Sequence, residues 1–430
     1  MSGGSVRLRH RVTELKTGPF GSALSADEYA DEGVPLVNPS DLRYGRIWPD
    51  AAVKVSEAVA ERMHAYRLRA GDLVLGRRGE LGRYGLVGRE EAGFLCGTGS
   101  LLVRPNAGLA ARFFGYFLET REARDWLSLQ SVGSTMENLS EAILGHLPIP
   151  DLAAHEQEHI ANFLDVQTAR IDALIAAKER LVESLQAYQY SRSSHLMTRG
   201  MDEGVPAVQT SFPEVGRVPA HWTVKRLKFL GEIRAGVAKG KDLGERDTVS
   251  MPYLRVANVQ DGYVDLTEVS HIEVPVSDAG RYLLKRGDVL MNEGGDNDKL
   301  GRGAVWQGQI DPCIHQNHVF AVRLSDPANA EWVSRFTSTD AARAYFFLRS
   351  KQSTNLASIN QTNVRELPVP MPPKGERSAI LSELRRVAES TGDLVNHALG
   401  HIDRLREYRS SLISAAVTGQ LDLGTFKAAA

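Results

Sequence analysis

Few residues in this chain have the types and spacing that a chemical reaction needs. The segment from Gly236 to Asp242 is rich in glycine and lysine, but it lacks the spacing and the final hydroxyl of a phosphate-binding loop. The Pro372-Pro373 pair lacks the preceding Asn or Asp and the following aromatic residue that hold a flipped base in amino-methyltransferases. The sequence therefore predicts neither ATP binding by such a loop nor base methylation by this chain.

The acidic and histidine clusters do not complete a metal site. The acidic stretch 296–298 stands beside Lys299, as in a metal-dependent nuclease, but the aligned residues 77–80 of the first half have no such cluster. His155 and His159 are spaced i, i+4 on an expected helix, without an evident third ligand. We expect no catalytic residue and no metal site in this chain, and a nuclease is the alternative.

The composition is that of a globular protein with more than one domain. The chain has 430 residues, of which 42% are hydrophobic and 24% charged, and its formal net charge is −2. Any nucleic-acid surface must therefore be local or completed by a partner. The two cysteines, Cys96 and Cys313, do not align between the halves, which argues against a disulfide framework. Because no apolar run could span a bilayer and no apolar signal core is present, we expect a cytoplasmic protein.

The strongest pattern is an internal duplication. Residues 134–198 match residues 354–418 at a constant offset of 220, without a gap, so that Leu147-Pro-Ile-Pro150 falls on Leu367-Pro-Val-Pro370. Upstream, with small changes in offset, Gly18 aligns with Gly236, Gly71-Asp72 with Gly287-Asp288, and Arg104 with Arg323. A duplicated module predicts two similar surfaces related by a pseudo-twofold axis.

Each copy has a variable part and a regular part. The variable part reads as short strands interrupted by glycine, followed by helical segments with apolar residues three and four positions apart. The regular part has a heptad-like pattern over about 35 residues, or about 50 Å of helix. A domain of about 150 residues cannot easily cover such a helix. We therefore expect the two helices to pack on each other, with packing on their own domains as the alternative, and further partner helices could join them.

The predicted fold class is an α/β (α+β) tandem repeat, with two mixed α/β domains that are each followed by a long helix, the two helices pairing as an antiparallel coiled coil. The predicted parts are 1–150, the first helical region 151–200, a linker at 201–222, 223–370, the second helical region 371–420 and a tail at 421–430. The residues expected to pair the helices are Ile160, Leu164, Ile171, Leu174, Leu181, Leu185, Ile380, Leu384, Val387, Leu394, Leu405 and Tyr408.

Taken in their order along the chain, the repeated motifs resemble the specificity subunit of type I restriction-modification systems. The resemblance is carried by residues 17–42, 71–87, 96–105, 133–165 and 367–380, which include both L-P-x-P motifs. It spans nearly the whole chain, as in a full-length member. The resemblance implies two target recognition domains, 1–150 and 223–370, that each read one half of an asymmetric bipartite target in double-stranded DNA.

The resemblance also implies partners. Paired helices would set the spacer length and dock two modification (methyltransferase) subunits, and restriction subunits would supply translocase and nuclease activity. The chain itself would be non-catalytic and hold no cofactor, because S-adenosylmethionine, ATP and Mg²⁺ would bind the partner subunits. No membrane is implied. The alternative is a duplicated protein-binding scaffold without sequence-specific DNA readout.

Base readout needs polar side chains on exposed loops, and aligned loops that differ in identity are the candidates. These are Arg77, Arg78, Glu80 and Thr98 in the first copy, and Asn292, Asp296, Asn297, Lys299, Gln316, Asn317 and His318 in the second. Phosphate contacts are expected from Arg83, Arg302, Lys239, Lys241, Ser134, Thr135 and Thr354, the last three of which could equally cap helices. For each residue, an ordinary solvated loop position is the alternative.

Overall fold

The chain forms two compact units in the computed structural model. The first unit comprises residues 1–180 and 398–430, and the second comprises residues 181–397. The structure describes residues 4–20, 24–43, 45–49, 53–79, 81–131, 139–240, 244, 246–295, 300–352 and 357–423. Because the unit boundaries fall within the two long helices, each helix contributes to both units.

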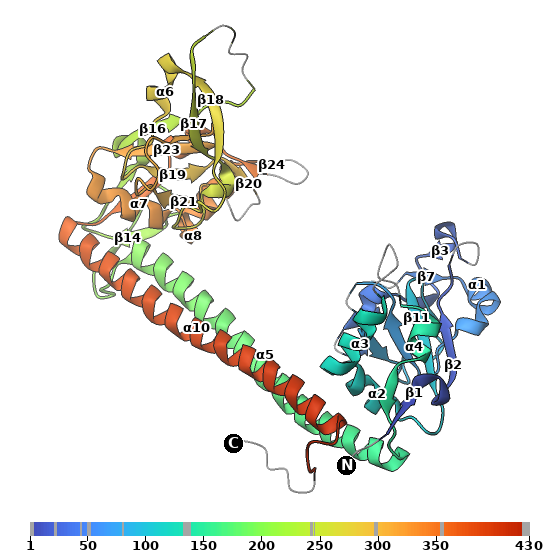
Figure 1. The fold of residues 1–430 in the computed structure, drawn as a ribbon. Helices are drawn as coiled ribbons and strands as arrows, with labels where there is room; N and C mark the ends of the chain where they lie inside the picture. The colour runs from blue at the N-terminus through green and yellow to red at the C-terminus, as the bar shows by residue number, and fades with distance from the viewer. Residues whose placement is uncertain are drawn as a thin grey trace. The chain divides into compact units, whose positions relative to one another are not determined.

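A four-stranded antiparallel sheet forms the centre of the first unit (Figure 1). Its strand order is β2-β11-β8-β9, with bounds Val12–Thr17, Ser100–Pro105, Leu73–Gly76 and Tyr84–Leu86. Successive side chains of a strand point to opposite faces, so Leu73 and Leu75 of β8 join one hydrophobic cluster and Val74 joins another. This is why the whole apolar run of β8 is buried.

Shorter elements surround this sheet. They are β1 (Ser5–Arg7), η1 (Leu8–His10), β3 (Tyr29–Ala30), β4 (Val34–Val37), β5 (Leu42–Arg43), β6 (Arg46–Ile47), β7 (Lys54–Val55), α1 (Glu57–Arg62), β10 (Leu95–Cys96), α2 (Ala111–Leu118), α3 (Arg121–Ser131), α4 (Glu141–Gly145) and β12 (Pro148–Pro150). Helix α2 buries Phe113, Phe114 and Phe117 in the same cluster as Leu73.

The second unit repeats the arrangement. Its central sheet has the order β16-β23-β19-β21, with bounds Gly231–Ala235, Val319–Leu324, Val289–Asn292 and Gly303–Val305. Strand β17 (Thr248–Leu254) pairs in parallel with β22 (Ile314–His315), as β4 pairs in parallel with β10 in the first unit. The α/β tandem repeat predicted from the sequence is therefore confirmed.

The remaining elements of the second unit are also short. They are β13 (Ala207–Gln209), β14 (Arg217–Pro219), β15 (Thr223–Arg226), β18 (Ser270–Pro275), α6 (Val276–Tyr282), β20 (Gly294–Gly295), α7 (Ala330–Phe336), α8 (Asp340–Arg349), β24 (Lys351–Gln352), β25 (Ala357–Ser358), α9 (Gln361–Arg365) and β26 (Pro368–Met371).

The L-P-x-P motifs form the short strands that lead into the long helices. β12 pairs antiparallel with β1, and β26 pairs antiparallel with β15. The backbone bond beside each pair is the same, because Leu8 N donates to Leu147 O and Leu227 N to Leu367 O, each at 2.9 Å. These pairs are two-stranded sheets, where a proline can face the open side without losing a ladder hydrogen bond.

The segment 201–222 is not the free linker that its composition predicted. Strands β13 and β14 form a hairpin within it, and Val215, Val218 and Trp222 are buried in the core of the second unit. The Trp222 ring packs edge-on against Trp332, with centroids 6.0 Å apart. Its prolines interrupt regular structure, but its apolar residues still pack.

The regular parts form α5 (Ala154–Arg199, 46 residues) and α10 (Lys374–Val417, 44 residues). In the first unit, Arg409 forms an ion pair with Asp172 at 3.0 Å, and Arg406 forms one with Glu179 at 3.0 Å. Residue numbers thus rise along one helix as they fall along the other. The antiparallel pairing of the two helices is confirmed there.

The helix ends also pack on the domains. Ile160, Leu164 and Ile171 of α5 share the first unit's core with Leu412, Ile413, Ala416 and Val417 of α10. In the second unit, Leu196 and Met197 of α5 share the core with Ile380 and Leu384 of α10. The two packing modes considered from the sequence therefore both occur.

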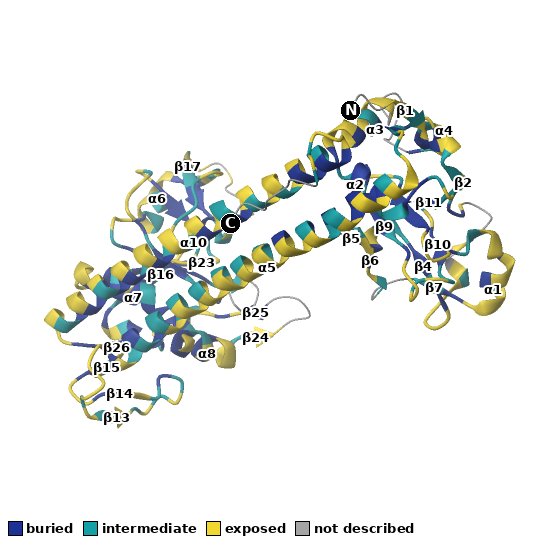
Figure 2. Ribbon diagram, turned by 90° about the horizontal axis from the view of Figure 1, so that it is seen from below, coloured by how far each residue is buried: buried dark blue, intermediate teal, exposed yellow. Residues whose placement is uncertain are grey.

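The predicted pairing seam is wrong in its central part. Leu174 (53%), Leu181 (48%), Leu394 (53%) and Tyr408 (40%) are exposed, and Leu185 and Leu405 are only half-buried. The residues buried along the helices instead include Thr168, Thr391, Ala398 and Ile402. A strict heptad drifts about 20° per repeat around a straight α-helix, so heptad positions leave a narrow seam after several turns. Figure 2 shows the exposed residues along both helices.

Candidate nucleic-acid interface

In the first unit, three loops meet at one edge of the central sheet. They follow β2, follow β8 and precede β11, and backbone hydrogen bonds join them. Gly18 N donates to Ser100 O, and Arg77 N donates to Gly99 O, each at 2.9 Å. Gly97 N donates to Val37 O, also at 2.9 Å, which ties the end of β4 to the same edge.

The second unit has the same arrangement. Val237 N donates to His315 O at 2.8 Å, and Asn317 N donates back to Val237 O at 2.9 Å. Glu293, which follows β19, donates its backbone N–H to His318 O at 2.9 Å. The loops after β16, after β19 and before β23 therefore form one continuous edge.

In each unit, a glycine allows two of these loop backbones to pass very close to each other, which we call the crossing. A Cβ atom on Gly18 would lie 2.0 Å from Gly97 O, and one on Gly236 would lie 2.0 Å from His315 O. Real Cβ atoms do not approach a carbonyl oxygen so closely, so only glycine fits. The alignment of the two glycines was the signal in the sequence for this shared crossing.

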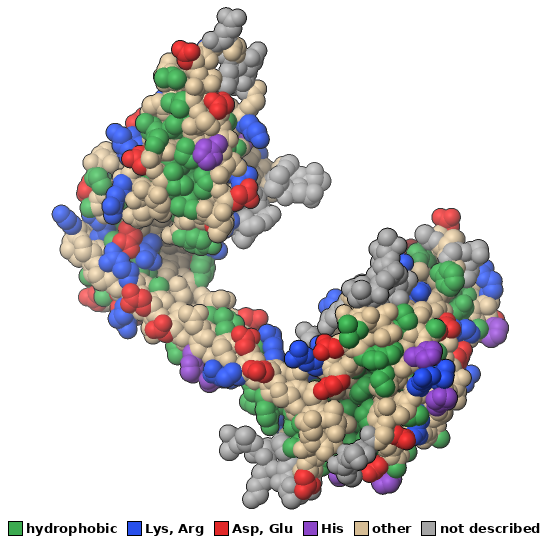
Figure 3. All heavy atoms as spheres, viewed as in Figure 1, with side chains coloured by type: hydrophobic (Ala, Val, Ile, Leu, Met, Phe, Trp, Pro, Cys, Tyr) green, Lys and Arg blue, Asp and Glu red, His purple; other side chains and the backbone are tan. Residues whose placement is uncertain are grey.

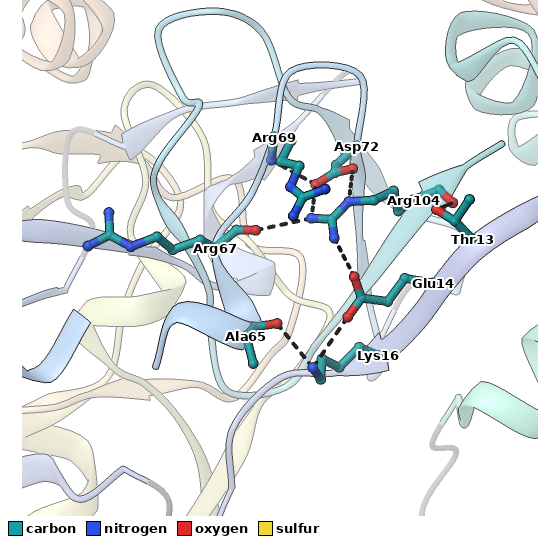
Figure 4. Close-up of polar contacts among 8 residues, drawn as sticks. All are labelled: Thr13, Glu14, Lys16, Ala65, Arg67, Arg69, Asp72 and Arg104. Atoms are coloured by element: carbon teal, nitrogen blue, oxygen red, sulfur yellow. Dashed lines mark hydrogen bonds and ion pairs between the residues drawn. The ribbon is translucent and has the colours of Figure 1, made fainter. Parts of the chain in front are cut away.

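A buried aspartate–arginine pair fixes the opposite end of each sheet (Figure 4). Arg104 donates from Nε and Nη2 to Asp72 at 2.9 and 2.8 Å, and Arg323 donates in the same way to Asp288 at 2.8 and 2.6 Å. Both aspartates are 2% exposed. The hydrogen bonds to Asp72 raise the pKa of Arg104, and those to Asp288 raise the pKa of Arg323.

We call these two aspartate–arginine pairs the frame. Their residues align between the two halves of the sequence, but no role was predicted for them. Each aspartate also accepts a backbone N–H from the turn before its strand, from Arg69 at 2.7 Å and from Lys285 at 2.8 Å. Glu14 of β2 adds a further carboxylate contact to Arg104 in the first unit. In each unit, this cluster thus holds one end of the central sheet, and the loop edge lies at the other end.

The two aligned arginines expected to contact phosphate lie in equivalent turns. Arg83 follows Gly82 (φ +85°), and Arg302 follows Gly301 (φ +65°). Both are half-buried, and each has a buried Nε without a hydrogen-bond partner in the described part of the chain. Arg302 Nη1 donates to Gln260 Oε1 at 3.0 Å. Their guanidinium groups are thus partly held by the fold, while Lys239 is exposed in the turn after β16.

Among the first unit's candidates for base readout, Arg78 and Thr98 are exposed on the loop edge. Arg77 is half-buried, its Nε donates to Leu139 O at 2.9 Å, and burial lowers its pKa. Arg77 therefore joins the edge to the segment before α4 through this bond. Arg78 and Thr98 are the better placed of the three for a ligand.

In the second unit, the prediction for Asn292 is wrong. Its side chain is fully buried, and its Nδ2 donates to Val259 O at 2.9 Å, so it supports the loop from beneath. Gln316 and Asn317 are half-buried, and His318 is exposed with its Nδ1 against Glu293 Oε2. Glu293 was not among the residues predicted for base readout, because nothing in the alignment of the two loops distinguished it from the adjacent Asn292.

Beneath this loop lies His315, the counterpart of Cys96. It is fully buried, its Nδ1 donates to Val319 O at 2.6 Å, and its Nε2 has no hydrogen-bond partner among the described residues. Burial lowers the pKa of His315 to about 4. The imidazole is thus neutral at physiological pH and acts as packing for the loop.

Several predicted residues lie outside the described residues. They are Glu80, Ser134, Thr135, Lys241, Asp296, Asn297, Lys299 and Thr354. Their roles stay predictions.

Comparison with known proteins agrees with the repeated architecture. Residues 12–184 match the family model described as the type I restriction modification DNA specificity domain. The EcoKI specificity subunit of Escherichia coli K12 is 24% identical over 95% of this chain and 87% of its own length. The StySPI specificity subunit of Salmonella potsdam is 23% identical over 91% of this chain and 83% of its own. Residues 12–184 thus match this DNA specificity domain, and nearly the whole chain is similar to type I specificity subunits.

A solved structure shares the fold of this chain. A chain from a study of complex assembly and conformational transition of the type I restriction-modification system aligns with a TM-score of 0.69 at 15% identity, covering 98% of this chain and 99% of that one. The fold of nearly the whole chain is therefore shared by a solved protein.

Two further features bear on the site. Within the described ranges, no group of three or more His, Cys, Asp or Glu side chains is placed to hold a metal ion. Every helix searched there is too short or too polar to cross a membrane.

Proposed function

We propose that this chain is the non-catalytic recognition subunit of a type I restriction-modification complex, and that the loop edge of each unit reads one half of an asymmetric bipartite sequence in double-stranded DNA. One observation carries the proposal. The same glycine crossing and the same aspartate–arginine frame present different side chains in the two units. A shared frame with divergent exposed groups suits two different half-sites.

The exposed groups have the chemistry of base readout. Arg78 can donate two hydrogen bonds to the O6 and N7 atoms of a guanine, and Thr98 can contact several bases. In the second unit, Gln316 or Asn317 suits adenine, and Glu293, held beside His318, suits the N4 amino group of cytosine. Arg83, Arg302 and Lys239 suit the phosphate backbone, which positions the protein without reading sequence.

Replacing Arg78 by Ala tests this proposal. Loss of one bidentate contact is expected to cost about 1–3 kcal/mol of discrimination at one base pair. The methylated motif, mapped across a host genome that expresses the variant with its modification subunits, should relax in one half-site only. Arg89→Ala is the matched control, because Arg89 is exposed beyond the other end of β9. An unchanged motif, or one relaxed in both halves, would contradict the assignment.

The helices supply the surface proposed for the modification subunits. In the first unit, exposed Leu174 of α5 and Tyr408 of α10 line one groove of about 320 Å³. In the second unit, the repeat-related residues Leu394 of α10 and Tyr188 of α5 are exposed as well, at 53% and 57%. Each unit thus offers the same pair of apolar side chains, which suits two copies of one partner.

The helix pair would also set the spacer between the half-sites. Deleting residues 181–187 from α5 and the opposed residues 395–401 from α10 removes about 10 Å of each helix, or about three base pairs of DNA. The methylated motif should then keep both half-sites and lose about three base pairs from its spacer. A change in either half-site would count against the proposal.

Cofactors belong to the partners in this proposal. S-adenosylmethionine would bind the modification subunits, and ATP and Mg²⁺ would bind the restriction subunits. The purified chain should accordingly give no methyl transfer and no DNA cleavage with these additives, and should support methylation once modification subunits are added. Binding of the assembled complex to DNA without a selected bipartite motif would instead favour a protein-binding scaffold.

A further inference from the structure

The two units differ in ion pairing at one equivalent place near the start of their long helices. In the second unit, Arg226 and Lys228 both form ion pairs with Glu366, at 2.9 and 2.5 Å. The side-chain hydrogen bond from Lys228 lowers the pKa of Glu366. This carboxylate offsets one of the positive charges around it.

Among the described residues of the first unit, no carboxylate pairs with the corresponding cations. Because Leu8 and Leu227 make the same backbone bond, to Leu147 and Leu367, Arg7 and Arg9 correspond to Arg226 and Lys228. His146 then corresponds to Glu366. The repeat therefore replaces an acid with an imidazole beside two conserved cations.

Histidines position Arg9 without cancelling its charge. Arg9 Nε donates to His10 Nε2 at 3.3 Å, and Arg9 Nη1 lies 3.5 Å from His146 Nε2. His146 Nδ1 donates to Ala142 O at 2.7 Å, which leaves Nε2 free to accept from Arg9. Among the described residues, none of Arg7, Arg9, His10 and His146 forms an ion pair with a carboxylate, and all four are exposed. In Figure 3, some blue and purple side chains lie next to one another on the viewed face of the first unit.

We propose that Arg7, Arg9, His10 and His146 form a docking surface for an acidic segment of a partner protein, engaged by the first repeat and not by the second. The surface can take carboxylates from outside because the described residues of the first unit pair none with it, whereas the second repeat carries Glu366. A guanidinium group that is held in position and whose positive charge is not paired with a carboxylate is suited to bidentate binding of a carboxylate.

Its position favours a protein partner over the DNA that the loop edge would read. The cluster precedes β2, while Gly18 of the loop edge follows it. The six residues of β2 span about 20 Å at about 3.3 Å per residue. The loop edge that would contact DNA therefore lies at the opposite end of β2 from this surface. The surface also lies beside β12, which leads into α5.

The test uses the full chain and a fluorescently labelled oligoglutamate peptide at low ionic strength, with anisotropy as the readout. The wild-type chain should bind one peptide per chain. His146→Glu reproduces the second repeat's own residue and should weaken binding at least about tenfold, because it places a carboxylate between the two arginines. Arg9→Gln should weaken it as well, and Arg43→Gln, which removes an exposed charge elsewhere in the first unit, should not.

Glu366→His provides the converse test and should add a second peptide site. Unfolding in urea checks that each variant is folded. Two sites on the wild-type chain, or unchanged binding by His146→Glu, would overturn the proposal. So would a random-sequence DNA duplex that competes at this cluster more strongly than the peptide, because the surface would then be a phosphate site. None of these outcomes depends on which DNA sequence the loop edges read.

Discussion

Buried His315 should make the second unit sensitive to mild acid. Burial lowers its pKa from 6.5 to about 4, so the folded state binds fewer protons than the unfolded state between these pH values. Stability from this group is therefore fully present above about pH 6.5 and is lost as the pH falls toward 4. The 2.5-unit difference corresponds to about 3 kcal/mol at most, of which about 2 kcal/mol is lost between pH 7.5 and pH 5.

The matched variant is His315→Cys, because Cys96 occupies the equivalent buried place in the first unit. Urea unfolding of both proteins at pH 7.5 and pH 5, followed by tryptophan fluorescence, measures the difference. Trp222, Trp306 and Trp332 are buried in the second unit and dominate the signal. The wild-type chain should lose about 2 kcal/mol more than the variant over this range.

Other acid-sensitive groups act in a different window. Hydrogen bonds with arginines lower the pKa of Glu331 against desolvation, so its contribution to stability is lost only below about pH 4.5, as protonation begins. The comparison at pH 5 therefore isolates the histidine. If the wild-type chain and His315→Cys lost the same free energy of unfolding between the two pH values, the reasoning from burial would be refuted.

Two further predictions concern the frame and the crossing. Asp288→Asn should destabilise the second unit by about 3 kcal/mol, because it leaves Arg323 without its carboxylate partner. The control Glu273→Gln changes an exposed residue and should alter urea unfolding little. Equal effects of the two variants would argue against a structural role for the Asp288–Arg323 pair. Gly18→Ala should cost about 1–3 kcal/mol and disturb only the first half-site, because its methyl group would meet Gly97 O, while Gly280→Ala has open space and should be neutral in the same unfolding and methylation assays.

The duplication was visible in the sequence because it preserved the residues that the frame needs. Gly18 and Gly236, and the pairs Asp72 with Arg104 and Asp288 with Arg323, aligned before their contacts were known. Identity at those places reflects backbone crossings and buried charges that tolerate no other residue. The predicted order of two domains, each followed by a helical region, rests on the same alignment.

The individual reading residues were less predictable. Asn292 and His318 both looked like polar loop residues, but Asn292 is buried beneath the loop and His318 is exposed on it. Burial at the end of a strand depends on which face of the sheet the residue meets, and the type of residue does not reveal that face. The heptad prediction failed because a strict heptad drifts around a straight helix, and it left Leu174 and Leu394 exposed.

The sequence by itself determined that this protein is a tandem α/β repeat with two long helices and two divergent loop sets. These features follow from local periodicity and from identities kept between the copies, which one chain displays twice. Only the tertiary structure decided which polar side chains reach solvent and which apolar heptad residues stay uncovered. It also decided that Lys228 pairs with a carboxylate and that Arg9 pairs with none among the described residues. Those outcomes depend on burial and on contacts between residues far apart in the chain, which no local pattern encodes.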